Sequence, residues 1–401
     1  MYEIKSLDHY GKGITFVNDK ITFVKNALPN EQVEIELTKE SKKFNEGVVK
    51  KYIKKSLTRI SPECPYYTIC GGCNIMHMDY NEQLSFKENK VKEILKKFSN
   101  ITDSINPIIG TSHINYRNKI TLQVNSNLGL YKENSYEIVP IENCLISDNN
   151  INKIINLLSK LNLTNISQII IRATLANEIM VILVVNNKID EDYFINNLNK
   201  ICTSLIKKEK NNYTTLYGKD YIVEEINNFK FKISPEAFFQ VNTKGAFIMY
   251  EIVKKYAGNG DTLLDLYCGT GSFGIYLSNN FKKVIGIEIN EYAKDDAEEN
   301  ALLNNINNIE FICGDANKKI DKLKDIDTII IDPPRSGLER VGIENILNIK
   351  PQKIIYVACD PISLARDINA LKESYNVIEI TPLDMFPNTY HVECICLLEL
   401  I

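Results

Sequence analysis

The chain has 401 residues, of which 44% are hydrophobic and 24% are charged. These proportions are typical of a soluble globular protein. The longest apolar run, Ile179 to Val185, is too short to cross a bilayer, and the residues that follow Met1 form no apolar signal-peptide core. The length predicts two or three domains, and we expect a cytoplasmic monomer with no membrane partner.

Charge is distributed unevenly along the chain. The formal net charge of −4 gives no overall sign of a nucleic-acid-binding protein. Residues 39–59, however, contain eight basic and two acidic side chains, which is a local charge of +6. Such a segment is either a solvated face or a place where the phosphates of a nucleic acid are contacted.

Residues 1–57 form the first expected domain. Short strand-like runs are separated by turns, and apolar residues alternate from Gln32 to Leu37. This spacing is typical of a small β-barrel. The segments from Gly11 to Val24 and from Ala27 to Glu31 resemble a TRAM domain, which is an OB-like barrel that binds RNA. The resemblance therefore implies an RNA-binding module at the start of the chain.

Four of the ten cysteines are expected to form a metal site. In the cytoplasm thiols bind metals or act in catalysis more often than they form disulfides. Glycine and proline around the first three cysteines allow a tight backbone, and a fourth cysteine lies far downstream. Spacing alone leaves zinc and an iron–sulfur cluster open, because both accept four thiolates. The expected ligands are Cys64, Cys70, Cys73 and Cys144.

The rest of the chain changes character near residue 233. Residues 58–232 are expected to be a central, mainly β domain, with strand-like runs such as 119–124 and 179–185 and helices near 84–99 and 149–161. In residues 233–401 strands and helices alternate, with strands expected at 263–266, 284–287, 310–312, 328–331 and 354–357. This pattern predicts a parallel, doubly wound, Rossmann-like α/β sheet.

A glycine-rich turn follows the first of these strands. It runs from Asp265 to Gly274, and Glu288 ends the next strand, where a carboxylate can accept hydrogen bonds from ribose hydroxyls. Asp265 at the strand end disfavours a pyrophosphate, because two negative charges would meet there. S-adenosylmethionine therefore fits better than NAD, while a plain structural turn is the alternative. Asp315 is expected near the adenine, with a loop cap as its alternative.

Two further strand ends carry reactive side chains. Asp332-Pro333-Pro334-Arg335 follows one apolar run, and its prolines prevent the strand from continuing. Cys359 follows another run at the carboxyl end of a buried strand, where open α/β sheets place their chemistry. A free cysteine in a core is usually a small hydrophobic residue, so position alone leaves a nucleophile and a packing role equally open for Cys359.

These motifs together resemble the RNA (uracil-5-)-methyltransferase family. The resemblance rests on residues 263–271, 331–337, 356–361, 364–367 and 384–393, and it extends in order over essentially the whole chain. It implies that Cys359 is the nucleophile and Glu393 the general base. It implies cofactor contacts by Gln240, Tyr267, Glu288 and Asp332, and by Ser272 at a position where family members often carry asparagine. Phe238 is expected either to stack on the substrate base or to be a core aromatic.

The same resemblance implies the remaining partners. The four cysteines are expected to hold a 4Fe-4S cluster, as in the subgroup that also carries the barrel. That subgroup favours 23S rRNA as the substrate, with tRNA as the alternative. We therefore expect an enzyme that transfers a methyl group from S-adenosylmethionine to C5 of a uridine in RNA. Cytosine-5 methylation and a catalytically silent iron–sulfur RNA-binding protein are the rival interpretations.

Overall fold

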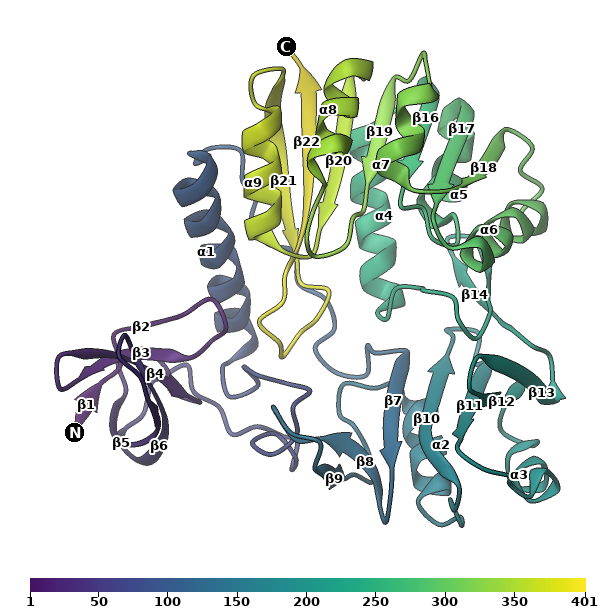
Figure 1. The fold of residues 1–401 in the computed structure, drawn as a ribbon. Coiled ribbons are helices and arrows are strands. Elements are labelled where there is room, and N and C mark those ends of the chain that lie inside the picture. The colour runs from purple at the N-terminus through teal and green to yellow at the C-terminus, as the bar shows by residue number, and fades with distance from the viewer.

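The computed structural model describes residues 1–401, apart from the side chain of Asp321. Three large sheets organise the chain (Figure 1). The N-terminal and central sheets lie in the lower half of the view, and the third sheet, with most of the helices, lies in the upper half. None of the helices in the described chain is long and apolar enough to span a membrane.

The N-terminal sheet contains six strands in the order β1-β5-β6-β4-β3-β2. It curls, because β1 at one end of this order returns to β3, where Thr15 Oγ1 donates a 2.8 Å hydrogen bond to Glu3 O. Val24, Ala27 and Val33 form its small core. The strands are β1 (Tyr2–Glu3), β2 (Ser6–Leu7), β3 (Gly13–Val17), β4 (Lys20–Lys25), β5 (Gln32–Glu40) and β6 (Asn45–Lys54).

The central sheet has seven strands in the order β13-β12-β11-β10-β7-β8-β9. Its core is made by one face of β10 and β11 and by the helix α2. The strands are β7 (Lys119–Val124), β8 (Leu128–Tyr131), β9 (Ile138–Pro140), β10 (Ile166–Ala173), β11 (Ile179–Val185), β12 (Ser204–Glu209) and β13 (Asn212–Gly218). The helices are α2 (Asn149–Leu158) and α3 (Glu191–Leu198).

The C-terminal sheet also has seven strands, in the order β18-β17-β16-β19-β20-β22-β21. Its strands are β16 (Gly260–Leu266), β17 (Phe281–Glu288), β18 (Ile309–Cys313), β19 (Thr328–Ile331), β20 (Lys353–Ala358), β21 (Tyr375–Leu383) and β22 (Glu393–Leu400). Its helices are α4 (Thr243–Ala257), α5 (Ser272–Leu277), α6 (Glu291–Leu303), α7 (Ala316–Lys319), α8 (Arg340–Ile349) and α9 (Pro361–Leu371). Short 3₁₀ turns follow α5 at Ser278–Asn280 and α7 at Ile320–Lys322.

The expectation of a wholly parallel sheet is wrong at one edge. Strands β16 to β20 are parallel, but β22 runs antiparallel to β20 and pairs with β21 in a hairpin. A hairpin needs no crossover helix, so the last two strands enter the sheet without the helix that a parallel strand would require. As a result, β22 is inserted beside β20 with its first residue at the carboxyl end of β20.

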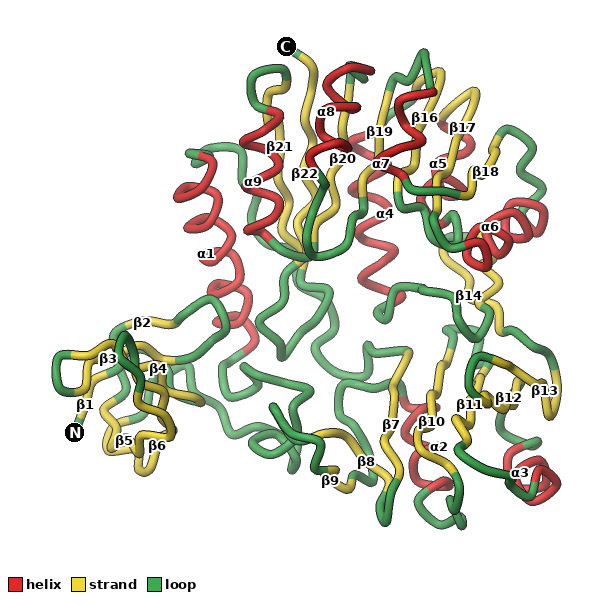
Figure 2. Tube along the Cα trace, viewed as in Figure 1, coloured by secondary structure: helices red, strands yellow, loops and turns green.

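Segments that come earlier in the chain pack against the C-terminal sheet. The helix α1 (Tyr80–Ser99) lies beside α9 (Figures 1 and 2) and buries Val91, Ile94 and Leu95 in the core of this sheet. Residues 105 and 109 form isolated bridges with β21. The hairpin of β14 (Ile222–Ile226) and β15 (Phe229–Ile233) packs into a second core cluster of the same sheet. The domain limits 1–57, 58–232 and 233–401 stay a prediction. In the structure, α1 and this hairpin pack against the C-terminal sheet, although they fall within the expected central domain or at its end.

Candidate active site

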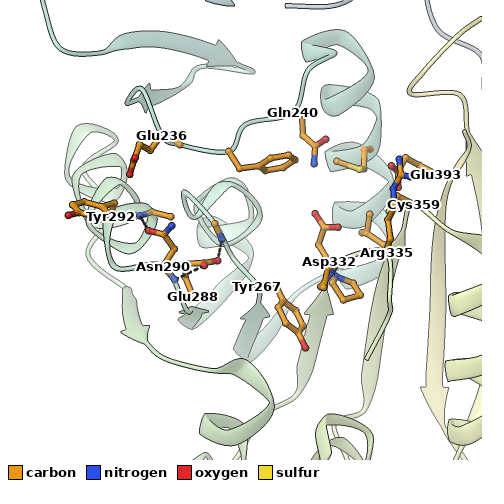
Figure 3. Close-up of a pocket in the computed structure, with 18 of the residues that line it drawn as sticks. Glu236, Gln240, Tyr267, Glu288, Asn290, Tyr292, Asp332, Arg335, Cys359 and Glu393 are labelled. Carbon is orange, nitrogen blue, oxygen red and sulfur yellow. Dashed lines mark hydrogen bonds between the residues drawn. The ribbon is translucent and has the colours of Figure 1, made fainter. Parts of the chain in front are cut away.

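A cavity of about 480 Å³ opens at the carboxyl ends of the parallel strands. Side chains from the ends of β16, β17, β19 and β20 and from the start of β22 line it. Figure 3 shows that Glu288, Asn290 and Tyr292 lie toward one end, and that Arg335, Cys359 and Glu393 lie toward the other. We call these the Glu288 end and the Cys359 end. Ligands of open α/β sheets bind at this edge of the sheet.

The glycine-rich turn after β16 is built for close packing. Asp265 is fully buried, and its Oδ2 accepts a 2.9 Å hydrogen bond from Gly274 N, which fastens α5 to the strand. Gly271 has a φ of +78°, and a Cβ there would lie 2.8 Å from Phe311. Burial raises the pKa of Asp265 to about 8. The buried Asp265 carboxyl group therefore holds the turn in place, and Tyr267 and Gly269 of the turn line the cavity.

The Glu288 end is organised by one carboxylate. Glu288 Oε2 accepts from Gly269 N at 3.0 Å, and Oε1 accepts from Asn290 N at 2.8 Å, as the dashed lines in Figure 3 mark. These bonds fix the carboxylate and leave lone pairs free for a further donor. Tyr267 also lines the cavity and has a φ of +62°, an uncommon conformation for an aromatic residue. Its hydroxyl donates to Asn317 Oδ1 at 3.0 Å.

The Cys359 end follows from strand register. In the antiparallel pair of β20 and β22, Ala358 is opposite Cys394, so Cys359 and Glu393 occupy the next opposing positions. In the parallel pair of β16 and β19, Leu266 is beside Ile331, so Asp332 emerges next to the glycine-rich turn. Pairs of strand ends therefore place a thiol and two carboxyl groups around one space, which is lined by all three residues.

Burial and mutual charge shift the acidity of these groups. Burial, with a contribution from Asp332, raises the pKa of Glu393 to about 8, and burial raises the pKa of Asp332 to about 7. Burial and the negative charge of Glu393 raise the pKa of Cys359 to about 11, while the positive charge of Arg335 acts in the opposite direction. Perturbed groups that cluster in a cleft are a mark of functional sites.

The side chain of Arg335 has a neutral partner. Its Nη2 donates to His391 Nε2 at 3.4 Å, and burial together with the charge of Arg335 lowers the pKa of His391 to about 4. A guanidinium group has only donors, so the imidazole must accept through Nε2 and carry its proton on Nδ1. His391 and Phe386 are cavity residues to which the sequence analysis gave no role, although both lie in the quoted segment 384–393.

The loop between β15 and α4 closes the cavity on the remaining side. Gln240 lines the cavity and points into it in Figure 3. Phe238 also lines it with 66% of its surface exposed, so its reading as a core aromatic is wrong. Glu236, Asn290 and Tyr292 are further lining residues that the sequence analysis missed. Of these three residues, Asn290 could have been found from the sequence. It comes two residues after Glu288, and asparagine is a preferred cap of a helix such as α6.

Two expected cofactor residues do not line the cavity. Ser272 is the first residue of α5, and its side chain is absent from the lining. Asp315 caps α7, accepts from Asn317 N at 3.0 Å and pairs with Lys318. Its alternative reading as a loop cap therefore matches the geometry. Asp315 reaches the cavity only through Asn317, which accepts from the hydroxyl group of Tyr267.

The four expected ligand cysteines line a separate cavity of about 400 Å³ between the cysteine-rich loop and the central sheet. All four are free thiols that are partly buried. Burial raises the pKa of Cys64, Cys70 and Cys73. As they stand, the described side chains include no group of three or more His, Cys, Asp or Glu residues that could hold a metal ion. The structure thus gathers these cysteines but does not by itself display a metal site.

Comparison with known proteins identifies the class. The family model for tRNA (Uracil-5-)-methyltransferase matches residues 79–401. The chain is 36% identical to an uncharacterized RNA methyltransferase of Clostridium tetani, over 97% of this chain and 93% of that protein. It is 35% identical to one from Caldanaerobacter subterraneus subsp. tengcongensis, over 99% and 97%. The fold and these relatives define an S-adenosylmethionine-dependent RNA methyltransferase.

One solved structure indicates which kind of RNA methyltransferase this chain resembles. The Pyrococcus abyssi tRNA (uracil-54, C5)-methyltransferase in complex with S-adenosyl-L-homocysteine superimposes with a TM-score of 0.83. It is 27% identical, and the match covers 99% of both chains. The protein belongs to the RNA uracil-5-methyltransferase family. An enzyme of this family binds S-adenosylmethionine, which agrees with a cavity at the carboxyl edge of the sheet.

Proposed function

We propose that the protein methylates C5 of a specific uridine in RNA through a covalent bond to Cys359. One observation carries this proposal: a single cavity joins a ribose-binding type of carboxylate at the Glu288 end to the thiol and carboxyl group at the Cys359 end. A methyl donor and a planar base can therefore meet inside one space. The target nucleotide must leave its stack to enter, which costs roughly a few kcal/mol and least in a loop.

Each step has a group to perform it. The Cys359 thiolate adds to C6 of the uracil, and the electrons of the C5–C6 double bond move to form an enolate. C5 then takes the methyl group from the sulfonium, whose carbon–sulfur bond breaks to leave a neutral thioether. Glu393 accepts the C5 proton, the double bond re-forms, and the thiolate leaves. Covalent addition thus divides one difficult substitution into easier steps.

The charges at the Cys359 end support these roles. A pKa of about 11 leaves Cys359 mostly protonated at neutral pH, so the thiolate must be stabilised when the substrate is bound. Arg335 already lowers the pKa of this thiol, and the sulfonium of the cofactor adds a second positive charge. Glu393 is buried and raised to a pKa of about 8, which suits a group that exchanges a proton near neutrality.

We assign cofactor contacts to Gln240, Tyr267, Glu288 and Asp332, all of which line the cavity. Glu288 is held by two backbone N–H groups and is oriented to accept from ribose hydroxyls. Asp332 lies between the two ends in Figure 3, where a carboxylate faces a cationic methyl donor favourably. Ser272 and Asp315 remain weaker assignments, since neither lines the cavity.

We infer that residues 1–57 are a TRAM-type RNA-binding barrel. The curled six-stranded sheet supports this, as does the strand β6, which carries Lys50, Lys51 and Lys54 at exposed positions. Basic groups on one strand are suited to backbone phosphates and give binding that weakens with salt. RNA affinity that is unchanged between low and moderate salt would contradict this role.

We propose that the second cavity holds a 4Fe-4S cluster. Cys64, Cys70, Cys73 and Cys144 line one space of sufficient size, and Gly72 N donates to Cys70 Sγ at 3.4 Å, a type of contact that tunes cluster sulfurs. Neighbouring thiolates repel one another, so a positively charged centre is needed to deprotonate them together. The cluster would fix the loop that leads into α1, with no redox step assigned to it.

Anaerobically purified protein should contain about four iron atoms and four acid-labile sulfides per chain. Cys70→Ser should lose most of this iron, because one of its ligands is removed. Cys313→Ser is the matched control, since Cys313 is exposed and outside the cavity, and it should keep the wild-type iron content. One zinc ion per chain, or equal iron in both variants, would reject the cluster.

We propose 23S rRNA as the substrate, because the barrel and the cysteine site occur together. A tRNA substrate is the second candidate, favoured by the similarity to the Pyrococcus abyssi tRNA enzyme over both complete chains. Mapping 5-methyluridine in rRNA and tRNA of cells with and without the gene should show one or more rRNA positions that lose the methyl group. Loss at a tRNA position would select the second candidate, and loss at neither would overturn the proposed function.

A further inference from the structure

The connection between β21 and β22 leaves the C-terminal sheet and reaches the N-terminal part of the chain (Figure 1). We call residues 384–392 the hairpin loop. It contributes Phe386 and His391 to the Cys359 end of the cavity and leads directly into Glu393. Loops of this kind are mobile unless other segments hold them. The contacts that hold the hairpin loop therefore bear on the catalytic geometry.

Asn388 is the most connected residue of the hairpin loop. It is 3% exposed and has a φ of +67°. Its backbone N–H donates to Gln83 Oε1 at 2.9 Å, and Gln83 Nε2 donates to its Oδ1 at 3.2 Å. Its Nδ2 donates to His113 O at 2.7 Å, and its carbonyl oxygen accepts from Asn74 N and Ile75 N. All four polar groups of Asn388 are thus bonded to distant segments.

Other contacts surround this point. Lys87, fully buried on α1, pairs with Asp384 and donates to Phe386 O at 3.1 Å. The hydroxyl group of Tyr116 donates to Pro387 O at 3.0 Å. The anchors come from the cysteine-rich loop, α1 and residues 111–118, all of which lie between β6 and β7 in the sequence. In the described chain, the side chains of Asn388 and Gln83 form no hydrogen bond with a residue of the Glu288 end, while Asn118 of the anchoring segment donates to Gln240 O at 3.0 Å.

We propose that Asn388 and Gln83 are positioning residues for the Cys359 end of the cavity, where the uridine is proposed to bind. They hold the hairpin loop so that His391 meets Arg335 and Phe386 faces the base. This inference rests on the proposed function, because it concerns the geometry in which Cys359 attacks uracil. It goes beyond that function by placing the control of this geometry on α1, roughly 300 residues earlier in the chain than the loop it holds.

The test measures covalent attack at the Cys359 end and cofactor binding at the Glu288 end separately. Asn388→Gly keeps the backbone bonds and tolerates the positive φ, so it deletes only the side-chain bonds. Gln83→Leu removes the partner at similar volume. In a 23S rRNA transcript that contains 5-fluorouridine, fluorine replaces the C5 proton and cannot be removed by a base, so the methylated covalent adduct accumulates. Both variants should form it at least about tenfold more slowly, with calorimetric affinity for S-adenosylmethionine within about twofold of wild type.

Asn308→Gly is the matched control, because it deletes two side-chain bonds, to Ser278 O and Phe281 O, at the opposite end of the sheet. It should leave adduct formation unchanged. The double variant should slow adduct formation by less than the product of the two single-variant effects, because the bond from Gln83 Nε2 to Asn388 Oδ1 is lost in both single variants. Wild-type adduct rates in both single variants would overturn the positioning role. Absence of adduct with the wild-type enzyme on both 23S rRNA and tRNA transcripts that contain 5-fluorouridine would instead reject the proposed function.

Discussion

Cys359→Ala is expected to abolish methyl transfer to RNA, with turnover lower by at least about 1000-fold. Without the thiol, C5 of uracil has no carbanion character and cannot attack the methyl group. The cofactor contacts lie on other strand ends, so calorimetric affinity for S-adenosylmethionine should stay within about twofold of wild type. Transfer of a radioactive methyl group to RNA measures the first effect, and titration of the cofactor measures the second.

Glu288→Ala provides the reciprocal control. It removes the carboxylate that Gly269 N and Asn290 N orient, so affinity for the cofactor should fall at least about tenfold. The Cys359 thiol should still react with iodoacetamide at the wild-type rate. Wild-type turnover by Cys359→Ala would remove the covalent mechanism, and wild-type cofactor affinity in Glu288→Ala would remove the assignment of the Glu288 end.

Glu393→Gln is expected to trap the enzyme on its substrate. Addition of the thiolate and methyl transfer precede the loss of the C5 proton, so both should proceed, whereas elimination should slow by at least about 100-fold. A protein–RNA adduct that survives denaturing electrophoresis should accumulate with unmodified RNA. The adduct should disappear when Cys359→Ala is added to the same chain. Rapid turnover without an adduct would show that another group accepts the proton.

The pH dependence follows from the same carboxyl group. Because its pKa is about 8, Glu393 is protonated at low pH, and its deprotonated fraction increases as the pH rises toward 8. Only the deprotonated carboxylate can accept the C5 proton, so wild-type elimination should accelerate over that range. The effect on stability has the opposite sign. A raised carboxyl pKa stabilises the folded chain fully below the ordinary value of 4.5, and this contribution is lost as the pH rises through about 8. The melting temperature of Glu393→Gln should therefore decline less between pH 6 and pH 9.

Local sequence pattern predicted most of the strands. The runs 119–124, 179–185 and 328–331 coincide with β7, β11 and β19, because runs rich in β-branched residues and bounded by polar turns favour strands. The helix expected at 84–99 begins earlier, at Tyr80, where Asp79 caps it. Strand-end positions also made Glu288 and Cys359 candidates, whereas Glu393 was expected only from the resemblance to the methyltransferase family.

What could not be predicted depends on distant pairing. The insertion of β22 beside β20 decides that Glu393 faces Cys359, and no local pattern encodes that register. The role of Asn388 likewise depends on Gln83, 305 residues earlier. For Asp315 the sequence left two roles open, because an acidic residue after a strand can cap a helix as well as bind a nucleoside, and the structure shows the cap. For Phe238 the sequence left a base-stacking role and a core position open, and the exposure of its side chain excludes the core position.

The attachment of α1 and residues 105–109 to the last strands has a consequence for how the protein is made. Asn106 Nδ2 bonds to Glu379 across 273 residues, and Lys87 bonds to Asp384 across 297. On the ribosome, the barrel can fold soon after it emerges, but α1 must wait with its apolar face uncovered until α9 and β21 have emerged. An interrupted chain would therefore contain the proposed RNA-binding barrel without a catalytic base, and would expose the apolar surface that chaperones and proteases recognise.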